Sequence, residues 1–102
     1  QRVLVLGDMA ELGPTADALH ARAGTEAKAL GLNSLLTLGP RSAHAAKAFG
    51  IGGKAFTTLD ELIEALKPQL KAHTTVLVKG SRSAGMERVV AALLQQKTED
   101  TH

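Results

Sequence analysis

The chain alternates between short apolar runs and longer segments of helical periodicity. Continuous apolar runs, which predict buried strands, occur at 2–6, 34–38 and 75–79, with a shorter run at 54–57. Between them lie segments in which apolar residues recur every three or four positions. This order of elements predicts an α/β fold with a mainly parallel sheet and right-handed crossovers.

The first two predicted helices have recognisable ends. The first opens at Pro14 or Thr15 and ends before Gly31, which suits the position after a helix. The side of this helix expected to face the core is apolar: Leu19, Ala23, Ala27 and Leu30. The second helix is short and Ala-rich, and Pro40 suits its first position.

The third predicted helix starts with a capping box, Thr58 to Glu61, and Pro68 should kink or interrupt it. Its expected buried stripe is Leu59, Leu62, Ile63, Leu66 and Leu70. A last helix is expected over about 84–96, with a polar tail at 97–102. One domain therefore covers residues 1–96.

The apolar character of the strands predicts their order. Strands 2–6 and 75–79 are the most continuously apolar, so we expect them to be central neighbours, with 34–38 and 54–57 stepping outward from 2–6. Numbered along the chain, the order is 4-1-2-3. The strand 75–79 then lies at an edge with no charge before Lys79 to discourage association. The simplest explanation is that a neighbouring strand is missing from this chain.

Composition narrows the class of protein. The 102 residues fit one domain, and aromatic residues make up only 2%, which disfavours single-stranded nucleic acid as a partner. The 12 basic and 10 acidic residues are interspersed, so neither nucleic acid nor a membrane surface is expected as a partner. The absence of cysteine excludes disulfides and thiolate metal sites.

Two loops that follow apolar strands carry the candidate chemistry. The first holds Asp8 and Glu11, which could bind Mg²⁺, a ribose or an ammonium group; a turn residue and a surface carboxylate are equally good interpretations. The second begins at Lys79 and Gly80. Because ligands of open α/β sheets bind at the carboxyl ends of the strands, both loops should border one crevice.

The second loop also carries Ser81 and Arg82. Lys79 and Arg82 could bind a carboxylate or phosphate, Arg82 through two hydrogen bonds, although two solvated charges explain them equally well. Ser81 could contact a substrate, but capping of the last helix is the better interpretation.

Other catalytic and metal motifs are absent. Neither glycine-rich nucleotide motif is present, and no pair of histidines has metal-ligand spacing, so we expect no metal site and assign no catalytic residue. His20 is the one histidine beside the first loop. An exposed helical histidine is its preferred interpretation.

Together, residues 5–13 (VLGDMAELG), the downstream His20 and residues 76–87 (VLVKGSRSAGME) resemble the C-terminal domain of the Mur ligases along nearly the whole chain. The resemblance implies a three-layer Rossmann-like domain that lacks one or two N-terminal strands of the family domain. It implies substrate contacts by Asp8, Glu11 and the Lys79–Arg82 loop. Asp8, Met9 and His20 are implied as nucleotide contacts.

The loop sequences are most similar to members that add D-alanyl-D-alanine to UDP-N-acetylmuramoyl-tripeptide, by way of an acyl phosphate, in bacterial peptidoglycan synthesis. For such a cytoplasmic enzyme the resemblance implies ATP and Mg²⁺, bound mainly by a central domain, with the central and N-terminal domains as partners. The chain alone should be inactive.

Two other classes stay open. A self-contained flavodoxin-like binding or signalling module would use Asp8 as part of an acidic cluster. A structural interaction domain would carry its polar loops without a ligand.

Overall fold

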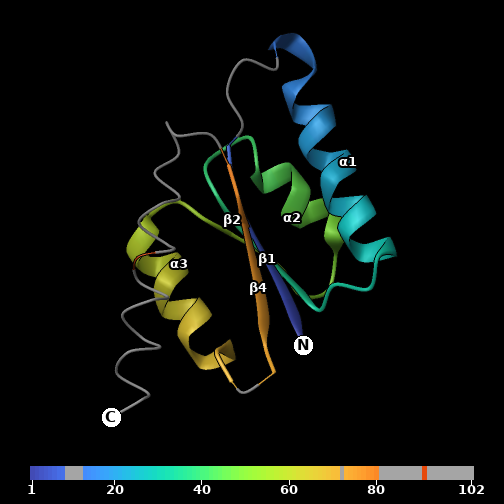
Figure 1. Ribbon diagram of the computed structural model, residues 1–102. Coiled ribbons are helices and arrows are strands. Elements are labelled where there is room, and N and C mark those ends of the chain that lie inside the picture. Colours follow the sequence, from blue (N-terminus) through green and yellow to red (C-terminus); the bar gives the residue numbers. More distant parts are fainter. Residues whose placement is uncertain (9–12, 72, 81–90, 92–102) are drawn as a thin grey trace.

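Four parallel strands form one sheet in the computed structural model (Figure 1), which describes residues 1–8, 13–71, 73–80 and 91. The strands lie in the order β3-β2-β1-β4. Their bounds are Arg2–Gly7 for β1, Ser34–Leu38 for β2, Gly53–Phe56 for β3 and Thr75–Lys79 for β4. The α/β class and the strand order 4-1-2-3 are therefore confirmed.

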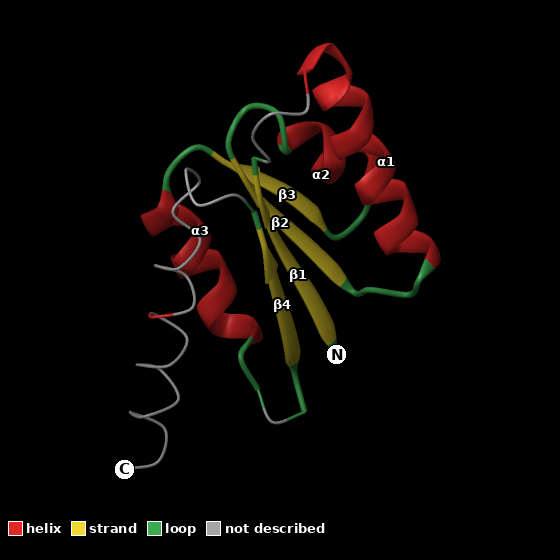
Figure 2. Cartoon of the chain, turned by 45° about the horizontal axis from the view of Figure 1, so that its top comes forward, coloured by secondary structure: helices red, strands yellow, loops and turns green. Residues whose placement is uncertain are grey.

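The helices lie on both faces of the sheet. The chain steps from β1 to β2 to β3 with α1 (Ala16–Ala29) and α2 (Ala43–Phe49) on one face, and reaches β4 by way of α3 (Leu59–Leu66) on the other face (Figure 2). Right-handed crossovers require this arrangement, because β4 lies in the opposite direction from β3. The switch in direction lies between β1 and β4.

Strand β1 is buried on both faces of the sheet, which explains why its sequence is continuously apolar. Its residues Val3 and Val5 join Leu36, Leu62 and Leu66 in the core on the α3 side. Alternate residues point to the other face, where a second core lies under α1 and α2: Leu4, Leu6, Ala27, Leu32, Leu35, Ala45 and Phe49. A strand buried on both faces cannot show polar alternation.

The predicted core-facing side of α1 is wrong for two of its four residues, because Ala27 is buried and Ala23 packs against the core, whereas Leu19 and Leu30 do not. The residues of α1 that are buried are Ala16, His20, Gly24 and Ala27, whereas Leu19 and Leu30 are 39% and 70% exposed. The reason is the close approach of α2, whose Ala45 backbone lies against Gly24. No side chain fits between Gly24 and Ala45 at this crossing, so α1 turns its leucines away from it.

The ends of α1 and α3 follow the sequence signals. At Gly31, φ is +82°, and the amides of Gly31 and Leu32 donate to the carbonyls of Lys28 and Ala27, which is a Schellman motif. The Thr58 hydroxyl oxygen accepts from the Glu61 amide (3.3 Å) and donates to its carboxylate (3.0 Å). The helix α3 ends at Leu66, and a 3₁₀ turn, Lys67–Gln69, follows it. This turn contains Pro68, which was predicted to interrupt the helix.

Several element boundaries differ from prediction; strand β1, for example, ends at Gly7, one residue beyond the predicted 2–6. The helix α2 begins at Ala43, three residues after the predicted start at Pro40, because residues 40–42 form a turn bound to Asp8. Strand β3 begins and ends one residue earlier than expected. The helix predicted over 84–96 and the tail at 97–102 lie outside the described residues, apart from residue 91.

The strand β4 is less buried than its sequence indicates. Among the described strands it lies at the edge, with Val76 and Val78 half-buried against the α3-side core and Leu77 45% exposed. The expectation of an edge strand is confirmed. The expectation of a strand buried on both faces is wrong for the described part of the chain.

Candidate functional site

The carboxyl ends of β1 and β4 lie side by side and define the candidate site. In the parallel register Leu6 lies opposite Lys79, so the chain leaves the sheet at Asp8 and at Gly80 on neighbouring strands. Of the predicted site residues, the structure describes Asp8, His20, Lys79 and Gly80. Met9, Glu11, Ser81 and Arg82 lie outside the described residues.

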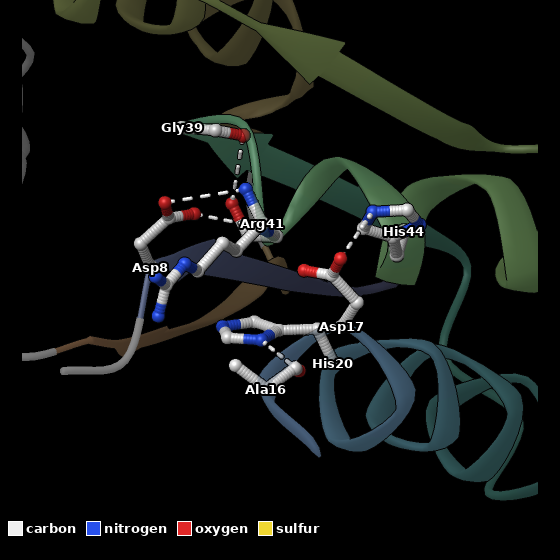
Figure 3. A network of polar contacts seen from close by, with 8 residues as sticks. Asp8, Ala16, Asp17, His20, Gly39, Arg41 and His44 are labelled. Carbon is white, nitrogen blue, oxygen red and sulfur yellow. Dashed lines mark hydrogen bonds and ion pairs between the residues drawn. The ribbon is translucent and has the colours of Figure 1, made fainter. Parts of the chain in front are cut away.

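The Asp8 carboxylate is bound to the loop that follows β2. Its Oδ1 accepts from the backbone N–H of Ser42 (2.7 Å), and its Oδ2 accepts from that of Arg41 (3.2 Å; Figure 3). Hydrogen bonds to an ionised carboxylate are stronger than neutral ones. Asp8 therefore ties the end of β1 to the start of α2, whatever else it binds.

The loop is shaped to receive this carboxylate. At Gly39, φ is +114°, and a Cβ there would lie 2.5 Å from the Asp8 Cγ, so a larger residue would displace the carboxylate. The Ser42 hydroxyl donates to the carbonyl of Leu38 at 2.9 Å, and Ser42 is fully buried. The polar edge of the sheet at β2 is thus rigidly built.

His20 lies buried on α1, which corrects the preferred interpretation of an exposed helical histidine. The residue is 0% exposed, and its Nδ1 lies 2.7 Å from the carbonyl oxygen of Ala16. Since a carbonyl oxygen only accepts, Nδ1 carries the proton in this bond. Figure 3 shows the ring on the side of α1 that faces Asp8 and Arg41.

Three functional candidates were not singled out in the sequence. Arg41 is exposed in the loop between β2 and α2, and His44 on α2 lies 3.5 Å from the Asp17 carboxylate on α1, between Nε2 and Oδ2. The Gly-Pro pair before Arg41, at the end of a strand, was an available signal. The pairing of His44 with Asp17 depends on how two helices cross, which no local pattern reports.

An apolar groove opens between α1 and β4, on the face of the sheet that α2 also covers. It has a volume of about 270 Å³, with Lys79 and Glu26 among its lining residues. The other lining residues are apolar: Leu4, Leu6, Ala23, Ala27, Leu30, Leu32 and Leu77. We call this the α1–β4 groove.

The described residues hold no group of three His, Cys, Asp or Glu side chains placed to bind a metal ion. No helix within the described part of the chain is both long and apolar enough to span a bilayer.

Comparison with known proteins gives a consistent result. A family model described as "Mur ligase, glutamate ligase domain" matches residues 1–82. The UDP-N-acetylmuramoyl-tripeptide–D-alanyl-D-alanine ligase of Escherichia coli K12 is 46% identical over 99 residues, which are 95% of this chain and 22% of that protein. The ligase of the same name from Buchnera aphidicola is 39% identical over 97 residues, 93% of this chain and 21% of that protein.

Solved structures agree with the sequence matches. Two crystal structures of MurF from Acinetobacter baumannii, both 30% identical, superimpose with TM-scores of 0.79 and 0.81. The matches cover 92% and 91% of this chain but 22% and 21% of the MurF chains. The chain thus spans about a fifth of the length of these relatives. With the family model matching most of its length and its fold shared with MurF, this chain belongs to the Mur ligase family and corresponds to the C-terminal domain.

Proposed function

We propose that the full-length protein is an ATP-dependent ligase that joins D-alanyl-D-alanine to UDP-N-acetylmuramoyl-tripeptide. The observation that carries this proposal is the 46% identity to the E. coli ligase of that name, spread over 95% of the chain. Because both ATP and the nucleotide-linked precursor are cytoplasmic metabolites, we place the enzyme in the bacterial cytoplasm.

In the proposed reaction ATP converts the tripeptide carboxylate into an acyl phosphate, which the amine of the dipeptide attacks. We assign ATP and Mg²⁺ mainly to the central domain, as the resemblance to the Mur ligases implies. The task of this domain is to position the dipeptide, since fixing two reactants in attack geometry contributes much of the rate. Closure over the site would also exclude water, which competes for the acyl phosphate.

Two loops of opposite charge suit a zwitterionic dipeptide. We assign its carboxylate to Lys79 and Arg82, with Gly80 and Ser81 beside them, and its ammonium group to the loop of Asp8 and Glu11. Lys79 and Asp8 support this assignment, because they end neighbouring strands. The bonds from Asp8 to the Arg41 and Ser42 amides give that carboxylate a structural task as well.

We further assign Asp8, Met9 and His20 to the region that borders the nucleotide. Since His20 is fully buried, it would influence the nucleotide through the loop above it rather than by direct contact.

The α1–β4 groove supports the proposal that this chain is an N-terminally incomplete domain. Parallel sheets are normally covered on both faces, yet none of the described elements fills this groove. Three of the four α1 residues that the sequence marked as sheet-facing, Ala23, Ala27 and Leu30, line it. The apolar stripe of α1 therefore has an open surface where a packing partner is expected.

Handedness indicates what would fill the groove. A strand added beyond β4 and connected to β1 by a helix would step in the same direction as β1 to β2. A right-handed crossover then places that helix on the α1 face, over Leu77 and Leu4. We propose that the full-length chain supplies this helix and strand, that residues 1–96 form the rest of the domain, and that 97–102 is a polar tail.

The test is amide formation by the full-length protein. ADP release should require both the UDP-linked tripeptide and D-alanyl-D-alanine, and mass spectrometry should detect the pentapeptide product. The 102-residue chain alone should release no ADP above a mock preparation. ADP release by the full-length protein without a dipeptide requirement would refute the proposed substrate, and turnover by the isolated chain would refute the division of labour between domains.

A further inference from the structure

Besides Lys79, a second positively charged residue, Arg41, lies at the carboxyl edge of the sheet, beside Asp8. Arg41 is exposed in the loop between β2 and α2, and Figure 3 shows its side chain extending from this loop past Asp8. Arg41 and Lys79 thus come from strands on opposite sides of β1. Neighbouring strands lie about 4.8 Å apart, so β2 and β4 are separated by about 10 Å. Both long side chains can reach one small ligand above β1.

The guanidinium of Arg41 is not engaged by a carboxylate of the described residues. Two other cations in this part of the chain are paired with a carboxylate: Arg22 Nε lies 3.1 Å from Glu26, and Lys67 Nζ lies 3.3 Å from Glu64. Five lysine or arginine side chains in the described part of the chain form no hydrogen bond or ion pair with another described residue. Arg41 and Lys79 are the two of them at the carboxyl edge of the sheet. The remaining three are Lys47, Lys54 and Lys71.

The backbone that presents Arg41 is fixed from several directions. Its own amide and that of Ser42 donate to Asp8, and the Ser42 hydroxyl donates to Leu38. The close approach of Gly39 to the Asp8 carboxylate adds a steric constraint. A ligand that binds Arg41 would have to order only its side chain, which lowers the entropic cost of binding.

We propose that the Arg41 guanidinium binds an oxyanion of a substrate, either the carboxylate of D-alanyl-D-alanine or a phosphate oxygen of one of the two nucleotide substrates. This inference rests on the proposed ligase function. A guanidinium donates two parallel hydrogen bonds to either group, which a lysine cannot. Arg41 is then a specificity-determining residue that acts with Lys79 across the end of β1.

Steady-state kinetics of the full-length enzyme test this role, with each of the three substrates varied in turn. Arg41→Ala should raise KM for one anionic substrate about 10-fold or more, as expected for loss of a charge-assisted hydrogen bond. Arg41→Lys should recover only part of the loss. The matched control is Lys47→Ala, which removes an exposed cation from the last turn of α2 and should change no KM. The thermal midpoint of Arg41→Ala should equal that of wild type, because the amide that bonds Asp8 remains.

The substrate affected identifies the oxyanion. A raised KM for the dipeptide assigns its carboxylate, and a raised KM for ATP or for the UDP-linked tripeptide assigns the corresponding phosphate. Three KM values within twofold of wild type overturn the inference, as does an equal rise in all three with a lowered thermal midpoint. If wild type is active and Arg41→Ala is normal, only this inference fails. A wild-type enzyme that forms no amide with D-alanyl-D-alanine refutes the proposed function and this inference together.

Discussion

At the crossing of α1 and α2, sequence and structure predict opposite effects of the substitution Gly24→Ala on the stability of the chain. Gly24 lies inside α1, and glycine in a helix is about 1 kcal/mol less favourable than alanine. Sequence reasoning alone therefore expects Gly24→Ala to stabilise the chain. In the structure a Cβ at this position would lie 2.7 Å from the Ala45 carbonyl carbon and 2.9 Å from its Cα, and closer still to the carbonyl oxygen.

The magnitude follows from how little α2 can move. Non-bonded carbon atoms pack at about 3.5–4.0 Å, so α2 would have to shift by roughly 1 Å. Its residues Ala45, Ala46 and Phe49 are buried, which opposes any such shift. Overpacking of this kind costs about 1–3 kcal/mol, and we take the upper end because the obstacle is backbone. After subtracting the helix-propensity gain of about 1 kcal/mol, Gly24→Ala should destabilise by about 2 kcal/mol.

Thermal and urea unfolding of the 102-residue chain, followed by circular dichroism, measures this effect. The expected fall in the thermal midpoint is roughly 8–16 °C for a domain of this size. Thr25→Ala is the matched control, since Thr25 is the next residue of α1, is exposed, and should gain a few tenths of a kcal/mol from helix propensity. A Gly24→Ala variant as stable as wild type, with an unchanged urea m-value, would refute the argument from the helix crossing.

Three further predictions concern the sheet edge, the groove and the second loop. Asp8→Ala should lower the free energy of unfolding by about 2–3 kcal/mol, because it removes a carboxylate that accepts two backbone hydrogen bonds. Chemical denaturation measures this loss, and an unchanged midpoint would mean that water replaces the carboxylate at no cost. Leu77→Glu should change the unfolding free energy of the 102-residue chain by less than about 0.5 kcal/mol, since the side chain is already 45% exposed. If a helix covers the α1–β4 groove in the full-length protein, the same substitution should lower its unfolding free energy several times as much. Equal effects in the two proteins would argue against such a helix. Arg82→Ala in the full-length enzyme should lower kcat/KM for D-alanyl-D-alanine roughly 10- to 150-fold while leaving use of ATP nearly unchanged, and an equal loss for all three substrates would discard a dipeptide-binding role.

Strand order was accessible from the sequence because continuous apolar runs mark the most buried strands, and the helix signals were accessible because they are local. The run Val3–Leu6 is apolar at every position, a pattern typical of a strand that is covered on both faces. Gly31 and the Thr58–Glu61 pair end or start helices through contacts within a few residues, so their prediction needed no tertiary information.

The candidate site was only partly predictable. That Asp8 and Lys79 end neighbouring strands follows from the strand order. Which partner Asp8 binds does not, because the Arg41 and Ser42 amides are more than thirty residues away in the chain and become neighbours only when β1 pairs with β2. The family resemblance suggested roles for residues, but it contained no information on Arg41.

The sequence by itself determined the class of fold, the family and the order of the four strands. Hydrophobic periodicity, capping residues and loop sequences are short-range signals, and the strand order followed from which runs are continuously apolar. Only the tertiary structure decided which face of α1 is buried. A hydrophobic pattern marks Leu19 and Leu30 as core residues, yet Gly24 is buried by its close contact with Ala45 of α2, a constraint of shape rather than of hydrophobicity. The same holds for β4: its run of Val76, Leu77 and Val78 is apolar enough for a central strand, but burial also requires a covering layer, and that layer depends on which elements lie beside it in space.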